Sequence, residues 1–227
     1  MAPHPKARPA AGRPPRVTPE RIRRAILEIE REVPTLPALA RQLGVGMATI
    51  YSHVRGQEEL ARLAADVVFD AWEIPAAPPG SRWADWMLAY ARDARRMIER
   101  YPVAHGSRPM AGGQLRHIDR VLTQLAALGM TPAEAIYAFH QVALLILVLG
   151  VQIEAIREEE ARAGVALWGL FREALSNHPG ELPALARLER QGIPALDSAF
   201  DELVWFTLTG IARRRGEILA AEPPRAS

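Results

Sequence analysis

Cysteine is absent from this sequence of 227 residues. The absence excludes a disulfide framework, and it excludes metal sites and nucleophiles that need a thiolate. Common motifs of catalysis are also missing, since no P-loop, no G-x-G-x-x-G turn and no G-x-S-x-G elbow occurs. Three histidines, His105, His117 and His140, lie on different predicted elements without the spacing of metal ligands. We therefore expect no enzyme, no bound metal and no cofactor.

Long hydrophobic runs are missing as well. The longest run, Val142–Val151, has ten residues, whereas a membrane-spanning helix needs about 20. Residues 1–17 lack the apolar region of a signal peptide. We expect a soluble, cytoplasmic protein that does not bind a membrane, with Val142–Val151 in a buried core helix.

Signals for β-strands are not found either. No segment alternates apolar and polar residues over a strand length, and no Asn-Gly or Asp-Gly turn occurs. Apolar residues instead recur at helical spacing, and Thr18-Pro19, Ser81 and Thr131-Pro132-Ala133-Glu134 are typical helix starts. The sequence predicts an all-α protein, with helices at 19–33, 36–43, 47–54, 57–72, 82–101, 114–128, 132–161 or beyond, 165–176, 183–191 and 195–219.

The positive charge is concentrated at the N-terminal end. Residues 1–62 carry 11 Lys and Arg against 6 Asp and Glu, while the remainder carries 17 against 20. This asymmetry indicates a polyanionic partner for the first part of the chain, or else a solvated basic face without a partner. The segment 73–80 holds three prolines, and we place the domain boundary there. The expected divisions are a disordered basic arm at 1–17, a first domain at 18–72 and a second domain at 81–219.

The segment 36–60 carries the main functional signal. It reads as two short helices joined at Gly44, followed by a third, and it leaves Thr49, Tyr51, Ser52 and His53 outside while Ile50 and Val54 point inward. A helix of about two turns with a polar face suits phosphates and base edges. Arg41, Arg55 and the cluster Arg21-Arg23-Arg24 are available as phosphate neighbours. The pattern is typical of a helix-turn-helix DNA-binding domain.

From Thr18 to Asp66 the sequence resembles the DNA-binding domain of the tetracycline-repressor (TetR) family. Leu39 to Leu60 follow the family pattern L-A-x-x-L-G-V-x-x-x-x-I-Y-x-H-V-x-x-x-E-E-L. The resemblance implies an N-terminal three-helix domain in which helix 57–72 links to a C-terminal bundle that binds an effector and dimerises. It also implies a transcriptional regulator that a small molecule releases from operator DNA. The alternative is a helical protein-interaction module that does not bind DNA.

The resemblance assigns roles to particular residues. Thr49, Tyr51 and His53 match positions that contact the DNA backbone, and Met47 and Ala48 match base-reading positions. Gly46 stands where Ser or Thr often caps the reading helix, and Gln57 stands where a Lys commonly meets a phosphate. The complete set of DNA-contact candidates is Arg13, Arg16, Arg41, Met47, Ala48, Thr49, Tyr51, Ser52, His53, Arg55 and Gln57.

Arg13 and Arg16 belong to the N-terminal arm. The run Ala11-Gly12-Arg13-Pro14-Pro15-Arg16 is partly similar to the Gly-Arg-Pro core of minor-groove arms. Arg13 would then enter a narrow minor groove. The alternative is a solvated leader without a DNA contact.

An effector pocket in the C-terminal helices is implied by the resemblance. Polar residues within apolar helices are the candidates for its lining, because burying them without partners is costly. Contacts within the helix or in the dimer are the alternative for His140 and Gln141. The effector is an unknown small molecule, and the candidates are Trp86, Tyr90, His105, Arg108, Gln114, His117, Tyr137, His140 and Gln141.

A homodimer is expected because one half-site reader covers too few base pairs. The long helices 133–160 and 195–219 resemble the pair with which the family forms a four-helix interface. Apolar residues of these two helices are the interface candidates: Leu145, Leu149, Ile153, Phe200, Val204 and Leu208.

Overall fold

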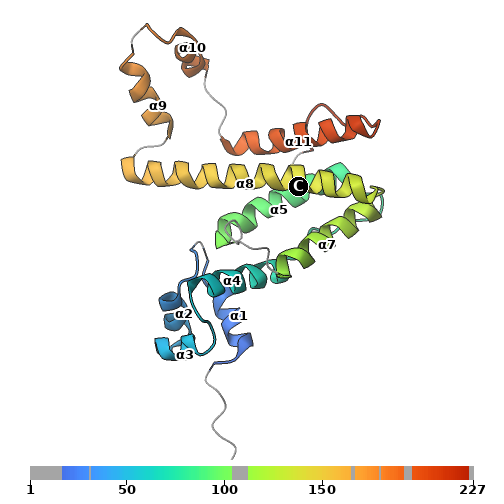
Figure 1. The fold of residues 1–227 in the computed structure, drawn as a ribbon. Coiled ribbons are helices and arrows are strands. Elements are labelled where there is room, and N and C mark those ends of the chain that lie inside the picture. The colour runs from blue at the N-terminus through green and yellow to red at the C-terminus, as the bar shows by residue number, and fades with distance from the viewer. Residues whose placement is uncertain are drawn as a thin grey trace, which may run out of the picture.

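The computed structural model describes residues 17–30, 32–103, 112–164, 167–178, 180–191 and 196–224. Within these ranges all regular structure is helical, which confirms the predicted all-α class (Figure 1). The helices are α1 Pro19–Glu28, α2 Leu36–Leu43, α3 Met47–Tyr51, α4 Gln57–Ala71, α5 Trp83–Arg100, α7 Gly112–Ala127, α8 Pro132–Ala163, α9 Leu167–Ser176, α10 Pro183–Gln191 and α11 Leu196–Arg214.

The predicted helix starts at Thr18 and Thr131 are confirmed. The Thr18 hydroxyl accepts a hydrogen bond from the Arg21 N–H at 3.3 Å. At α8 the Thr131 hydroxyl accepts from the Glu134 N–H, and the Glu134 carboxylate accepts from the Thr131 N–H at 2.8 Å. This reciprocal pair satisfies two N–H groups that the helix itself leaves without acceptors. The helix that begins there extends to Ala163, as the sequence indicated.

Helix α1 ends at Glu28, five residues earlier than predicted, and Val33 is 48% exposed. Residues far away in the sequence contact this end of the helix. The Tyr101 hydroxyl, at the end of α5, donates to the Leu27 carbonyl at 3.1 Å, and Arg100 pairs with Glu30 at 2.5 Å. These contacts attach the end of α1 to the end of α5.

Three other predicted boundaries were also wrong. Ser81 does not cap α5, because its hydroxyl donates to the Pro78 carbonyl at 2.7 Å and the helix starts at Trp83. Helix α3 ends at Tyr51, although Val54 beyond it is buried as predicted. Helix α11 ends at Arg214, and the chain then folds back so that the indole N–H of Trp205 donates to the Ala220 carbonyl.

Helix α4 joins the two parts of the molecule (Figure 1). Its first turns pack on α1 through buried residues such as Leu60 and Ala64, which share a core with Ile22 and Ile26. Its later turns lie along α7, and α5, α7, α8 and α11 complete the C-terminal bundle. Burial of apolar side chains at both ends of one helix therefore fixes the helix-turn-helix part relative to the bundle.

The contact between α4 and α7 depends on Gly113. This buried glycine lies against the backbone of Asp66, and its N–H donates to the Asp66 carboxylate. A Cβ added at Gly113 would lie 2.9 Å from the Asp66 Cα, closer than real Cβ atoms approach. Only glycine allows the two helices to approach this closely.

Replacing Gly113 with alanine should therefore destabilise the protein, by about 1–3 kcal/mol, because the two backbones must separate. Gly112→Ala is the matched control, since its Cβ would meet only side-chain atoms, namely the flexible guanidinium of Arg116 at 3.3 Å and the Asp66 carboxylate at 3.7 Å. Urea unfolding followed by circular dichroism measures both variants. Equal unfolding free energies for the two variants would contradict the assigned role of Gly113.

Candidate functional site

The corner between α2 and α3 is rigid. Gly44 has a φ of 66°, in the left-handed region that glycine adopts without strain. Its N–H donates to the Arg41 carbonyl at 3.2 Å, and the Val45 N–H donates to the Ala40 carbonyl at 3.0 Å. This pair of bonds is a Schellman motif, which ends α2 and sets the direction of the chain. Ile50 and Val54 are buried beneath α3, so the corner is held from both sides.

The outer face of α3 carries the predicted polar residues. Tyr51 is 54% exposed, Ala48, Ser52 and His53 are also exposed, and Met47 and Thr49 are half-buried. The Ser52 hydroxyl donates to the Thr49 carbonyl at 2.7 Å, so its oxygen is left mainly as an acceptor and cannot at the same time donate to a phosphate. Gly46 makes no side-chain cap, as the sequence indicated.

Gln57 is occupied within the protein. Its amide nitrogen donates to the Pro34 carbonyl at 2.7 Å, and its amide oxygen accepts from the Leu36 N–H at 3.3 Å. Gln57 therefore ties the first residue of α4 to the first residue of α2. Sequence reasoning treated it only as a possible phosphate donor and missed this bracing role.

The positive charges near the reading helix are fewer than the sequence indicated. Arg23 pairs with Asp70 at 3.0 Å and Arg24 pairs with Glu28 at 3.1 Å, so these two guanidinium groups are already partly neutralised. Arg41 and Arg55 are exposed and remain candidates. Arg13 and Arg16 lie outside the described residues.

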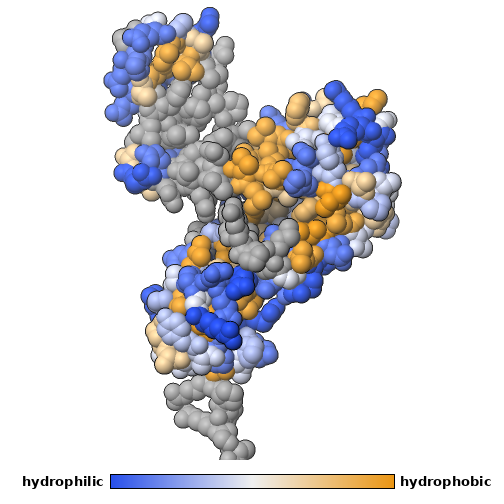
Figure 2. All heavy atoms as spheres, viewed as in Figure 1, coloured by the Kyte–Doolittle hydropathy of each residue, from blue (hydrophilic) through white to orange (hydrophobic). Residues whose placement is uncertain are grey.

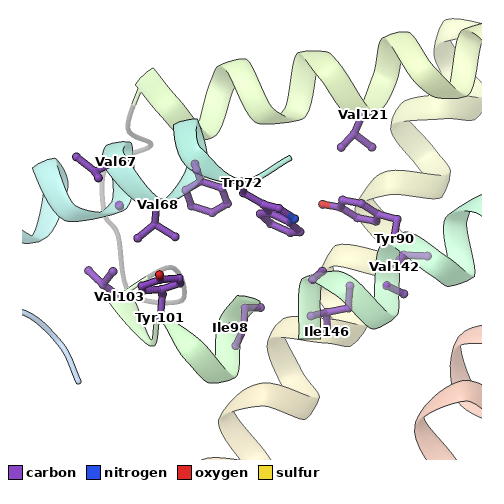
Figure 3. Close-up of a cluster of buried hydrophobic side chains, with 14 of the residues drawn as sticks. Val67, Val68, Trp72, Tyr90, Ile98, Tyr101, Val103, Val121, Val142 and Ile146 are labelled. Atoms are coloured by element: carbon purple, nitrogen blue, oxygen red, sulfur yellow. The ribbon is translucent and has the colours of Figure 1, made fainter. Parts of the chain in front are cut away.

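A cavity of about 80 Å³ lies where the end of α4 meets α5, α7 and α8. Figure 3 shows part of its wall, with the rings of Trp72 and Tyr90 side by side between these helices. Within the part of the chain that the structure describes, the lining has no charged side chain and consists of Phe69, Trp72, Tyr90, Ala94, Ile98, Gln114, His117, Ile118, Phe139, Ala143, Ile146 and Leu147.

Aromatic rings from three helices stack in the wall of the cavity. The indole of Trp72, which follows α4 directly, lies 4.0 Å from the His117 ring and 5.6 Å from the Tyr90 ring, centroid to centroid. Its N–H donates to the Asp93 carboxylate at 2.6 Å. The Tyr90 hydroxyl is hydrogen-bonded to His117 Nε2 at 3.1 Å. The end of α4 is thus part of the cavity itself.

His117 is neutral at physiological pH. It is 1% exposed, and burial, together with the nearby Arg120 guanidinium, lowers its pKa to about 4. Burial likewise raises the pKa of the Tyr90 hydroxyl above its ordinary value. In the described part of the chain, two buried polar atoms of the cavity lining have no hydrogen-bond partner, namely His117 Nδ1 and Gln114 Oε1.

Three of the nine predicted effector residues, Tyr90, Gln114 and His117, lie together in the cavity lining. Trp86 stacks on Tyr90 at 5.7 Å but donates its N–H to the Pro75 carbonyl, outside the lining. His105 and Arg108 lie outside the described residues.

The α8 candidates do not line the cavity. Tyr137 lies beneath the Arg214 guanidinium, His140 is exposed and Gln141 is half-buried. The helical period directs Phe139, Ala143 and Ile146 to the cavity instead. Sequence reasoning missed these apolar lining residues, together with Phe69 and Trp72, because it searched for polar residues in apolar helices.

Phe200, Val204 and Leu208 are not surface residues, contrary to the sequence-based expectation for the dimer interface. All three are buried in the chain's own core, on the side of α11 that packs against α5 and α8. Leu145 and Leu149 are half-buried, and the side chain of Ile153 lies outside the described part. Both faces of α11 are apolar, so hydrophobicity alone did not distinguish the inner face from the outer one.

Salt bridges and hydrogen bonds connect α4 to both of its neighbours. The Asp70 carboxylate accepts from Arg116 of α7 at 2.8 Å and from Arg23 of α1 at 3.0 Å, and these two guanidinium groups lower its pKa. Arg120 donates to the carbonyls of Phe69 and Trp72 at 2.8 and 3.1 Å. The C-terminal turn of α4 is therefore held mainly by side chains of α7.

The sequence profile described as "Tetracyclin repressor-like, C-terminal domain" matches residues 74–214. This chain belongs to the tetracycline repressor family. The similarity covers the bundle that forms the cavity, whereas the helix-turn-helix motif lies before it.

Two curated relatives are regulators of the helix-turn-helix type. The transcriptional repressor DrrR1 from Streptomyces coeruleorubidus is 30% identical over 139 residues, which are 58% of this chain and 52% of DrrR1. A transcriptional regulator from Saccharopolyspora erythraea is 29% identical over 156 residues, which are 65% of this chain and 63% of the relative. The chain therefore matches between half and two thirds of the length of these relatives.

Solved structures share the fold of this tetracycline repressor family member. Apo ActR from Streptomyces coelicolor aligns over 88% of this chain and 97% of its own, with a TM-score of 0.66 at 21% identity. ActR in complex with actinorhodin aligns over 88% and 99%, with a TM-score of 0.64 at 23% identity. At these identities the similarity establishes the arrangement of the helices.

The neutral state of His117 should make stability depend on pH. An unfolded histidine titrates near 6.5 and the folded one near 4, so between these values the unfolded chain binds a proton that the folded chain does not. The free energy of unfolding should fall by about 3 kcal/mol as the pH decreases from 6.5 to 4, compared with His117→Phe. Urea titrations at several pH values measure the difference, and parallel pH profiles would contradict the assignment.

Proposed function

We propose that this protein is a homodimeric transcriptional repressor that a small molecule releases from operator DNA. The observation that carries the proposal is the double role of α4. Its first turns pack in the helix-turn-helix part, and the residue that follows its last turn, Trp72, forms part of the cavity wall. A ligand that binds in the cavity must act on the same helix that positions α3, which is the coupling that ligand-controlled DNA binding requires.

The relatives support this proposal. DrrR1 is a transcriptional repressor, and ActR has been solved with actinorhodin and with (S)-DNPA. A repressor with an effector cavity in the C-terminal bundle fits the same family. We infer a cytoplasmic protein on the same grounds.

In the DNA complex, Thr49, Tyr51 and His53 contact phosphates, and Met47 and Ala48 pack against base edges such as a thymine methyl. Arg41 and Arg55 add positive charge at the backbone. Since Ser52 donates its hydroxyl to the Thr49 carbonyl and Gln57 is tied to α2, the protein contacts DNA mainly through Thr49, Tyr51, His53 and the two arginines. Arg13 and Arg16 of the arm contribute in the minor groove.

The effector acts by shifting the end of α4. At about 80 Å³ the cavity is smaller than the engineered cavity of about 150 Å³ that binds benzene in another protein. A ligand with an aromatic ring must therefore displace part of the wall. The side chain of Trp72 is held by stacking and by one hydrogen bond to Asp93. Its displacement pulls on the last turn of α4, which changes the separation of the two reading helices in the dimer.

Tyr51→Ala should weaken binding to every DNA sequence by about tenfold, because a phosphate contact carries no sequence information. Tyr51→Phe removes the hydroxyl and keeps the ring. It should show most of the same loss of affinity, because the hydroxyl makes the phosphate contact. Mobility shifts on the DNA upstream of the protein's own gene, and on a scrambled duplex, measure both. No shift at any protein concentration would favour the protein-interaction module, and a loss confined to the operator would reassign Tyr51 to base reading.

The dimer forms through the outer faces of α8 and α11. Leu144 and Val148 of α8 and Leu203 and Phe206 of α11 are exposed in the single chain. Figure 2 shows apolar side chains gathered over these two helices. The stretch Pro132–Leu149 is apolar enough by length and composition to span a membrane, and 22% of its residues are buried inside the chain. A second copy covers this apolar surface.

Phe206→Asp should convert the dimer to a monomer, because the side chain is 80% exposed and a carboxylate there would be buried without a partner in the interface. Ile218→Asp is the control, since Ile218 is 95% exposed but lies beyond α11. Light scattering after size exclusion at micromolar concentration gives the masses. A Phe206→Asp variant that stays dimeric would place the interface elsewhere.

A further inference from the structure

The lining of the cavity includes two residues, His117 and Gln114, that each carry an unpartnered buried polar atom. His117 Nδ1 and Gln114 Oε1 are buried and make no hydrogen bond within the described part of the chain, while Phe69, Ile118 and Phe139 line the same space. A buried polar atom without a partner costs roughly 1–3 kcal/mol. Such atoms in a cavity wall are suited to recognise the polar groups of a ligand.

The hydrogen bond between Tyr90 and His117 determines what His117 offers. A neutral imidazole has one N–H donor and one acceptor nitrogen. We assign the Tyr90 hydroxyl as the donor in its bond to His117 Nε2, and this tautomer places the imidazole proton on Nδ1. His117 then presents an N–H donor, and Gln114 Oε1, on the same helix one turn earlier, presents an acceptor.

The cavity also selects the charge of its ligand. Among the described residues of its lining, none is charged. The Asp93 carboxylate accepts from the Trp72 indole and from Arg96, so it is already paired. A charged ligand group would lose its hydration without gaining a counter-ion, which is much more costly than burying a neutral polar group.

We propose that the effector is a neutral, flat aromatic molecule that carries a carbonyl acceptor and a hydrogen-bond donor side by side. The carbonyl accepts from His117 Nδ1–H, the donor binds Gln114 Oε1, and the ring lies among Phe69, Trp72 and Phe139. This inference rests on the proposed function in taking the cavity as the effector site, and it adds the chemical class of the effector.

Three one-ring probes test the proposal on the wild-type protein without DNA. Benzamide has both the carbonyl and the N–H, N,N-dimethylbenzamide lacks the donor, and benzylammonium is a cation of similar size. Titrations followed by NMR should show benzamide binding at least fivefold more tightly than N,N-dimethylbenzamide, and no binding of benzylammonium. Equal affinities, a preference for the cation, or no binding of any probe would overturn the proposal.

Two variants assign the contacts. Gln114→Leu removes the acceptor, so it should weaken benzamide about tenfold and leave N,N-dimethylbenzamide unchanged. His117→Phe removes the donor but keeps a flat ring, so it should weaken both amides and leave toluene binding unchanged. His140→Phe is the control, since this histidine is exposed on α8. Unchanged benzamide affinity in both cavity variants would refute the assigned roles.

The same preparations separate this proposal from the proposed function. A protein that shifts operator DNA but takes up none of the probes refutes the effector class and leaves the repressor function in place. A protein that discriminates the probes as expected but shifts no DNA supports the cavity chemistry and refutes the repressor function.

Discussion

The burial of Trp72 is the constraint on which the arrangement of this molecule depends. The residue directly after α4 places a large ring among Tyr90, His117 and Phe69, and it satisfies its N–H with Asp93. An aromatic side chain of this size contributes more to packing than other residues do. Because the ring belongs both to the end of α4 and to the wall of the cavity, the orientation of α4 and the shape of the cavity cannot change independently.

Local signals in the sequence predicted part of the fold well. The bounds of α2 were predicted as Leu36–Leu43, and the capping box at Thr131 gave the start of α8, because a proline, a capping hydroxyl or a glycine acts on its immediate neighbours. The end of α1 was not predictable in this way. The last turn of α1 contacts Tyr101, which is 74 residues from Leu27 in the chain, and no sequence pattern near Glu28 indicates that contact.

The same contrast applies to the sites. The helix-turn-helix geometry was predicted from residues 39–60, because this short segment combines a glycine turn, two inward apolar residues and an exposed polar face. The cavity was only partly predicted, since Tyr90, Gln114 and His117 are polar residues in apolar surroundings but Phe139 and Ile146 look like any core residues. The dimer-interface residues of α11 were predicted on the wrong face for a related reason. Phe200 and Phe206 are equally apolar, and only the packing of α11 on α5 decides which of them is buried.

The bracing role of Gln57 has a mechanical consequence. Because one amide joins the start of α4 to the start of α2, and the Schellman turn joins α2 to α3, the helix-turn-helix part moves with α4 as a single body. Helix α4 has 15 residues and so is a lever arm of about 22 Å. A tilt of about 10° at the Trp72 end carries the other end by about 4 Å, more than the length of a hydrogen bond to a phosphate. A tilt of α4 at the cavity therefore moves α2 and α3 together, by a distance that grows with the length of the helix.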